Sequence, residues 1–274
     1  MIFNKNIYQY FIRKLMKMKI TKIKKMSSGK YNLVLDNKEK FVTYDEVILN
    51  NNLLFNKEID SELLNKLNID TKYYNIYNKI IKLISVRIRS EKEIYNYLEK
   101  NNIETNEQNK IIEKLKNNGL INDENFVRAF ISDKLNFSND GPNKIRNMLL
   151  EHNISNELID LELSKIDKSI YLEKINKLIN KKIKINKKYS DYVFKQKIIA
   201  DLKNCGYYYD DIIACLQNIN VNNDSLICEY YQKLYNKLKH KYDDSELDKK
   251  IKEKLYQKGF SLSEITDFYN KKIG

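Results

Sequence analysis

Apolar residues recur along this chain with a period of about fifty residues. Four ten-residue segments align without gaps, IYNYLEKNNI, IRNMLLEHNI, IIADLKNCGY and IKEKLYQKGF, at residues 94–103, 145–154, 198–207 and 251–260. Their first isoleucines, their central leucines and their final apolar residues all step by 51, 53 and 53 residues. A period that holds at three positions indicates a tandem repeat.

Each repeat has the pattern of a three-helix bundle. The isoleucine and the leucine of each segment are four residues apart and lie on one helical face, and the Asn-Ile or Gly-aromatic pair that follows is typical of a helix C-terminal cap. Further apolar patterns at helical spacing precede and follow each segment, for example Ile76, Ile80, Leu83 and Ile84 before the first. Capping boxes are expected at Ser90 with Glu93, Thr105 with Gln108, and Ser261 with Glu264, and Pro142 is expected in the first turn of a helix.

Residues 19–71 have a different pattern of apolar and polar residues. Tyr31, Leu33 and Leu35 alternate with polar residues, turn-forming residues flank them, and Phe41 begins another short apolar stretch. Thr43 to Glu46 has the spacing of a capping box before a short helix. The first strand has two interpretations, because Met16, Ile20 and Ile23 also fit helical spacing.

The predicted fold is mainly α: tandem three-helix bundles in an elongated, curved array, with a small β-rich N-terminal domain. We expect a basic N-terminal extension at 1–18, the β-rich domain at 19–71, and four repeats at 72–122, 123–166, 167–219 and 220–274.

Composition argues against an enzyme. The chain has only six glycines and one proline, and no two glycines lie close enough to cradle a phosphate. Three cysteines form no CxxC pair, and two histidines stand far apart. We therefore expect no catalytic residues, no cofactor and no metal. No apolar run approaches the ~20 residues that cross a bilayer, so we expect a protein of the cytoplasm that does not bind membranes.

The net charge of +13 is concentrated in two blocks. Residues 1–35 carry nine basic residues and no acid, and residues 165–203 carry twelve lysines against four acids. A local excess of positive charge attracts nucleic acid or an acidic protein surface. A lysine-rich chain from an AT-rich genome is the alternative explanation.

Candidate binding residues follow from this distribution. Lysines at 177, 181 and 184 share one helical face, and the proposed contact surface for DNA phosphate or an acidic protein groove comprises Lys177, Lys181, Lys182, Lys184, Lys187, Lys188, Lys195 and Lys197. For any single lysine, a solvated surface position is the alternative. Four arginines in a lysine-rich chain are further candidates, Arg87, Arg89, Arg128 and Arg146, with pairing to carboxylates of the repeats as the alternative. The Tyr207–Tyr209 run admits base stacking, although Tyr207 occupies a core position of the repeat.

Three stretches resemble the RecX family. Residues 87–94 (RIRSEKEI) are similar to the stretch that opens the middle helix of its first repeat, and residues 119–126 (GLINDENF) and 141–146 (GPNKIR) look like two later junctions. The resemblance covers roughly residues 19–274 and is most specific over 85–165. This chain departs from the family in replacing much of the usual alanine and arginine by Lys, Asn, Ile and Tyr.

The resemblance implies a non-enzymatic, monomeric regulator of DNA recombination and repair and of the SOS response. Its partners would be the RecA recombinase filament and single-stranded DNA, with double-stranded DNA as a further candidate, and it would inhibit RecA ATPase, strand exchange and filament growth. Two other functions remain open. The helical units could bind DNA directly without RecA, or the chain could be a scaffold for another protein.

Overall fold

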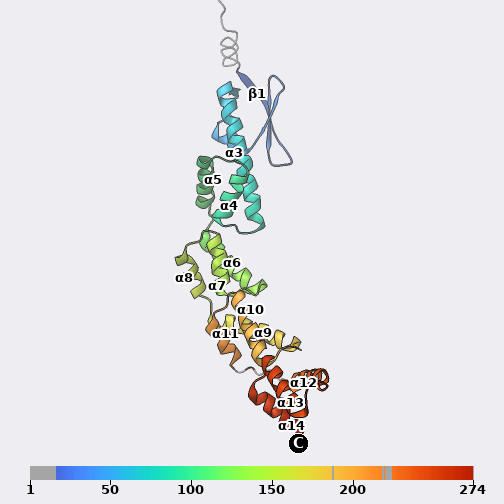
Figure 1. Cartoon of the computed structure of the whole chain (residues 1–274). Helices are drawn as coiled ribbons and strands as arrows, with labels where there is room; N and C mark the ends of the chain where they lie inside the picture. Colours follow the sequence, from blue (N-terminus) through green and yellow to red (C-terminus); the bar gives the residue numbers. More distant parts are fainter. Residues whose placement is uncertain (1–16, 187, 218, 220–223, 274) are drawn as a thin grey trace, which may run out of the picture. The chain divides into compact units, whose positions relative to one another are not determined.

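The computed structural model describes residues 17–273 except 187, 218 and 220–223, and only the backbone of Ile273. The chain divides into two compact units, Met1–Asp123 and Glu124–Gly274. Within the described residues, helices dominate and the strands all precede the long helix α3 (Figure 1). None of the helices in these ranges has the length and apolar character that a membrane span requires.

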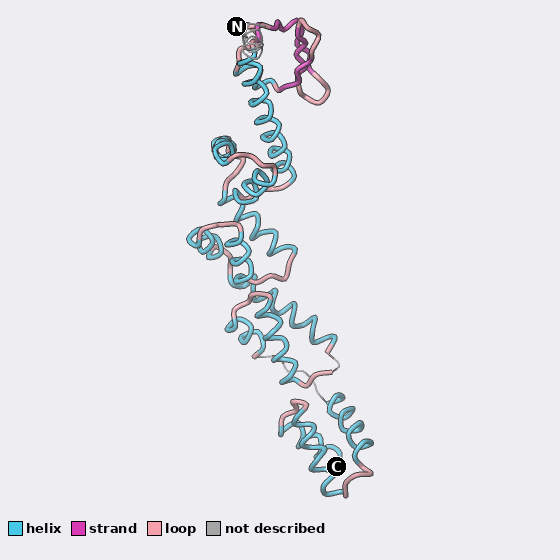
Figure 2. The backbone as a smooth tube through the Cα atoms, turned by 45° about the horizontal axis from the view of Figure 1, so that its top comes forward, coloured by secondary structure: helices cyan, strands magenta, loops and turns pink. Residues whose placement is uncertain are grey.

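Four short strands form an antiparallel sheet near the N-terminus (Figure 2). They are β1 (Met18–Lys25), β2 (Tyr31–Leu35), β3 (Lys40–Thr43) and β4 (Glu58–Ile59), in the order β3-β2-β1-β4, with α2 (Asp45–Asn50) between β3 and β4. Alternation along the strands places Ile20, Leu33 and Leu35 in the core. The strand interpretation of the first segment is therefore correct, and its helical alternative is wrong.

A 26-residue helix, α3 (Ser61–Val86), links the sheet to the first repeat. Its N-terminus is capped by Asp60, whose carboxylate accepts a hydrogen bond from the Leu63 N–H at 2.8 Å. The proposed domain boundary between residues 71 and 72 lies inside this helix. Sheet and first repeat also share one hydrophobic core, which includes Leu33, Leu67 and Leu98.

The remaining helices fall into groups of three. The first repeat contains α3, α4 (Glu91–Lys100) and α5 (Thr105–Asn117). The others contain α6 (Asp123–Phe137), α7 (Pro142–Glu151) and α8 (Asn156–Ser164); α9 (Lys168–Ile185), α10 (Asp191–Asn204) and α11 (Tyr209–Leu216); and α12 (Asp224–Leu238), α13 (Asp244–Gln257) and α14 (Leu262–Ile273). The predicted class, mainly helical with three-helix repeats and a small N-terminal sheet, is confirmed.

Every middle helix ends in the same turn. A residue with positive φ follows the helix in each repeat: Asn102 at 53°, Asn153 at 60°, Gly206 at 89° and Gly259 at 86°. The next residue donates its N–H to the carbonyl of the repeat's leucine, with lengths of 3.2 Å from Ile103, 3.3 Å from Ile154, 3.1 Å from Tyr207 and 3.3 Å from Phe260. This is a left-handed helix cap with an apolar contact, as predicted.

Two of the predicted capping boxes are confirmed and two are wrong. Ser90 with Glu93 and Ser261 with Glu264 make both reciprocal bonds. Helix α5, however, begins after Glu104, and Gln108 donates to the carbonyl of Ile103 instead. Helix α2 begins after Tyr44, because Thr43 ends β3 and its hydroxyl bonds that of Thr71 at 2.6 Å.

Within the second compact unit, consecutive repeats meet through their middle helices. At the start of α7, Gly141 donates its N–H to the carbonyl of Cys205 at 2.6 Å, and Asn143 donates to that of Gly206 at 3.0 Å. At the start of α10, the Ser190 hydroxyl donates to the carbonyl of Lys258 at 3.1 Å. Each contact joins the N-terminus of one middle helix to the turn that ends the next.

Substitution of Gly206 tests this contact. A Cβ atom there would lie 2.5 Å from the Lys144 backbone nitrogen, whereas one at Gly119 would meet nothing within 4 Å. Both glycines have positive φ, so Gly119→Ala should cost about 1–2 kcal/mol of unfolding free energy from backbone strain alone. Gly206→Ala should cost roughly 1–3 kcal/mol more. Urea unfolding of the two variants measures the difference, and equal losses would contradict the close approach.

Candidate functional site

The lysine-rich face belongs to helix α9. Tyr171, Ile175 and Ile179 are buried at four-residue spacing and fix the inner face of this helix. Lys177, Lys181 and Lys184 are consequently exposed on its other side. Within the part of the chain that the structure describes, none of these three ammonium groups forms an ion pair. Their charge is therefore available to an anionic partner.

A tight turn after α9 gathers more of the candidate lysines. The Asn186 side-chain oxygen accepts hydrogen bonds from the N–H groups of Lys188 and Tyr189, at 3.3 and 3.1 Å. Its amide group donates to the Tyr189 carbonyl at 2.8 Å. Asparagine favours such local bonds, which here hold Lys188 and Tyr189 next to the start of α10.

This turn and the two helices surround a pocket of about 250 Å³. Three predicted lysines, Lys182, Lys188 and Lys197, line it together with Ile185, Asn186, Tyr189, Phe194, Ile198 and Asp201. The Lys197 ammonium lies 4.7 Å from the centre of the Tyr189 ring, and that of Lys188 lies 5.8 Å from it. We call this set of residues the lysine–tyrosine pocket.

The other candidate lysines differ in their surroundings. Lys182 forms an ion pair with Asp201 across the pocket, and Lys195 pairs with Asp191 on its own helix at 2.8 Å. Lys187 lies outside the described residues. Helical spacing alone could not predict the Lys182 pair, because Asp201 lies on the next helix, whereas Asp191 lies four residues before Lys195 on α10.

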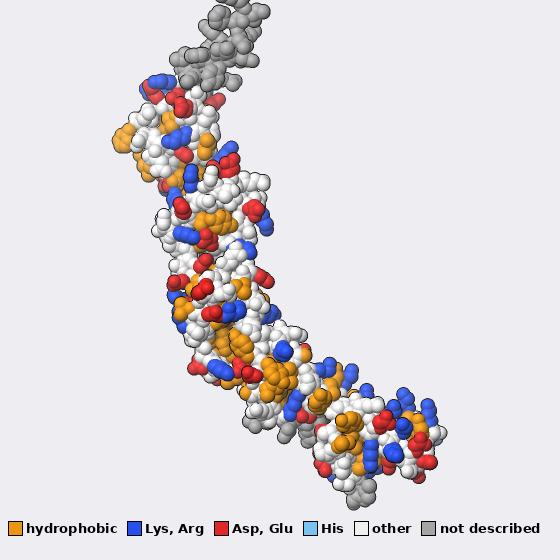
Figure 3. All heavy atoms as spheres, turned by 60° about the vertical axis from the view of Figure 1, so that its left-hand side comes forward, with side chains coloured by type: hydrophobic (Ala, Val, Ile, Leu, Met, Phe, Trp, Pro, Cys, Tyr) orange, Lys and Arg blue, Asp and Glu red, His pale blue; other side chains and the backbone are white. Residues whose placement is uncertain are grey.

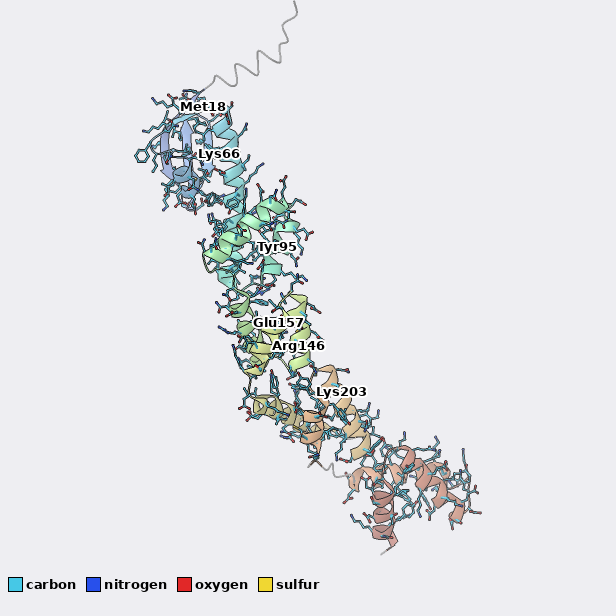
Figure 4. The ribbon with its side chains drawn as sticks, turned by 90° about the vertical axis from the view of Figure 1, so that its left-hand side faces the viewer. Met18, Lys66, Tyr95, Arg146, Glu157 and Lys203 are labelled. Carbon is cyan, nitrogen blue, oxygen red and sulfur yellow. The ribbon has the colours of Figure 1, made fainter. Side chains whose placement is uncertain are left out.

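The four candidate arginines all pair with carboxylates. Arg87 and Arg89 both contact Glu93 of α4, the latter at 3.7 Å. Arg146 of α7 pairs with Asp160 of α8, and Figure 4 shows its side chain beside α8, where Glu157 is labelled. These contacts lie within the first and second repeats, whereas the lysine–tyrosine pocket lies within the third.

Arg128 belongs to a charge cluster around the buried carboxylate of Glu162. It contacts Glu162 at 3.2 Å and Glu124 at 3.3 Å, and Lys165 contacts Glu162 at 2.6 Å. The Glu162 side chain is only 5% exposed. Hydrogen bonds from Arg128 and Lys165 hold the pKa of this carboxyl below its usual value. Arg128 therefore ties helix α6 to α8.

Tyrosines at 207–209 divide between core and surface. Tyr207 is 3% exposed and packs in the third repeat, as its repeat position predicted. Tyr208 and Tyr209 are exposed, and Lys203, labelled in Figure 4, lies over the Tyr209 ring at 5.9 Å. The space-filling view shows hydrophobic side chains at the surface among basic and acidic side chains (Figure 3).

Sequence reasoning missed Ile185 and Tyr189. Ile185 ends α9 and is 71% exposed, and Tyr189 follows a lysine pair that was considered only for its charge. A branched apolar residue and an aromatic residue inside a run of lysines was the signal available in the sequence.

These elements define a protein of tandem three-helix repeats that follow a small antiparallel sheet. A family model described as "RecX, second three-helix domain" matches residues 122–163. Regulatory protein RecX of Streptococcus agalactiae serotype III (strain NEM316) is 33% identical over 264 residues, which cover 90% of this chain and 97% of that protein. Regulatory protein RecX of Oceanobacillus iheyensis is 27% identical over 259 residues. The chain belongs to the RecX family, as its sequence motifs predicted.

Solved structures support the same fold. A crystal structure of a regulatory protein RecX superposes with a TM-score of 0.63 at 22% identity and covers 73% of this chain and 100% of its own. The crystal structure of RecX from Lactobacillus salivarius gives a TM-score of 0.50 at 26% identity and covers 53% of this chain and 94% of its own.

The Glu162 cluster predicts a pH effect on stability. Because its pKa is lowered in the folded chain, the carboxylate stabilises the fold above the ordinary value of 4.5, and this contribution is lost as the pH falls through the folded value. We expect Glu162→Gln to unfold at lower urea than wild type at about pH 7, and the gap to shrink towards about pH 3. Glu157→Gln, on the exposed side of the same helix, is the control. A constant gap would exclude the ion cluster as its cause.

Proposed function

We propose that this chain binds the RecA–single-stranded DNA filament and inhibits or modulates RecA ATPase, strand exchange and filament growth during recombination and repair. Membership of the RecX family carries the proposal, because the relatives that match along nearly their whole length are named regulatory proteins. The chain would act in the cytoplasm as a monomer, by binding rather than by catalysis. The elongated, curved array expected from the sequence is part of the proposal, since such a body could follow a helical groove.

The exposed face of α9 supports a contact with the filament. Lys177, Lys181 and Lys184 present three charges that no carboxylate of the described chain neutralises. Binding to DNA phosphates would release counterions, and binding to an acidic protein groove would also weaken with salt. We include Lys182, Lys188 and Lys197 in this contact. We assign the four arginines to stabilising the repeat to which each belongs.

Charge reversal tests the contact. We expect Lys177→Glu, Lys181→Glu and Lys184→Glu together to raise the concentration that half-inhibits RecA ATPase on single-stranded DNA by about tenfold or more, because three attractive charges become repulsive. The control reverses Lys237, Lys239 and Lys241, which are also exposed and change the net charge equally.

The same assay separates the proposal from direct DNA binding. Inhibition by wild type at concentrations far below saturation of the DNA supports an action on the filament. Inhibition only when the DNA is coated would instead favour a helical DNA-binding protein that competes with RecA. Equal effects of the two triple variants would remove α9 from the contact.

A further inference from the structure

The lysine–tyrosine pocket contains lysines that have no carboxylate partner among the described residues. Of its three lysines, only Lys182 has a carboxylate partner, Asp201. Within the described residues, Lys188 and Lys197 contact the Tyr189 ring and form no ion pair. Two ammonium groups in the lining of one pocket favour a ligand that carries negative charge.

The walls of the same pocket are apolar. Phe194 and Ile198 are buried members of the third-repeat core and form part of its lining, while Ile185 is largely exposed at its edge. Removing the apolar surface of an exposed isoleucine from water is favourable. Tyr189 is half-buried against the third-repeat core. A ligand that is only anionic would leave Ile185 and the uncovered part of the Tyr189 ring in water, whereas one with a flat apolar group beside the anion would cover them.

We propose that this pocket binds a nucleotide unit of single-stranded DNA, with the base against Tyr189 and Ile185 and the flanking phosphates at Lys188 and Lys197. Bases of a single strand can leave the stack and lie on an aromatic ring, whereas those of a duplex are paired and enclosed. The proposal rests on the proposed function in that it places DNA of the filament at the third repeat. It adds a contact with bases, which the lysine face of α9 alone does not supply.

The pocket binds bases without reading their sequence. Base edges are distinguished by fixed donors and acceptors. The two amide and carboxylate side chains that line the pocket are already engaged: Asn186 bonds the backbone of its own turn, and Asp201 pairs with Lys182. Stacking and apolar contact are tolerant of base identity, because every base has a flat face.

Strands without bases test this inference directly. Fluorescence anisotropy of the purified full chain, in the absence of RecA, would compare an oligothymidylate of about 15 nucleotides with an abasic strand of equal length. We expect wild type to bind the thymidylate about fivefold or more tighter, since one stacked base contributes about 1–3 kcal/mol. An oligodeoxyadenylate should show a similar advantage over the abasic strand.

Matched variants locate the effect. Tyr189→Leu should reduce binding of the thymidylate to the level of the abasic strand, and Ile185→Ser should reduce it in part. Tyr192→Leu, a substitution at a 63% exposed tyrosine of α10 that does not line the pocket, should change neither. The double variant Lys188→Gln, Lys197→Gln should bind both oligonucleotides more weakly, and its affinity should depend less on salt concentration. Thermal unfolding by circular dichroism confirms that each variant is folded.

Equal binding of the two strands by wild type would overturn the inference, because it would show contact with phosphates only. Equal effects of Tyr189→Leu and Tyr192→Leu would overturn it as well. The proposed function fails differently: a wild-type chain that prefers strands with bases but never inhibits RecA ATPase would retain the pocket and lose the filament role. If wild type inhibits RecA ATPase but binds the thymidylate and the abasic strand equally, the proposed function stands and the inference about the pocket fails.

Discussion

The turn that closes each middle helix combines a backbone constraint with an apolar contact. A residue with positive φ reverses the chain, and the following residue bonds back to the repeat's leucine. That residue is buried in the second, third and fourth repeats, and in the first it packs against the core as the partly buried Ile103. In the second compact unit the same turn also receives the start of the preceding middle helix, through Gly206 and Gly259. Packing inside a repeat and contact between these repeats therefore depend on one local geometry.

Local rules made the repeats predictable from sequence. Ile94, Leu98 and their equivalents are buried because helical spacing and turn chemistry agree at those positions. The rules failed where residues distant in sequence compete. Thr43 ends a strand and bonds Thr71 rather than starting a helix. A spacing motif predicts the hydrogen bonds that a residue can make with its sequence neighbours. It does not predict contacts with residues that are distant in the sequence.

The candidate site was predictable only in its charge. Lysine density identified the third repeat, but the exposed and the paired lysines differ through contacts such as Lys182 with Asp201, which join different helices. The lysine–tyrosine pocket depends on an asparagine turn and on an isoleucine at a helix end, and neither shows in a count of charges. Arg128 pairs with Glu124 and Glu162 at once, which a planar guanidinium allows.

Within the second compact unit, the hydrogen bonds at the turn between consecutive middle helices are accepted by main-chain carbonyls, and glycines admit the close approach. A main-chain carbonyl accepts a hydrogen bond whichever side chain its residue bears. These hydrogen bonds therefore constrain few of the side chains on the helix surfaces. Composition can then drift widely, here towards lysine, asparagine and isoleucine, while the connection persists. Substitutions on the exposed faces of a bundle can therefore change what it binds without changing the hydrogen bonds that join it to the next bundle.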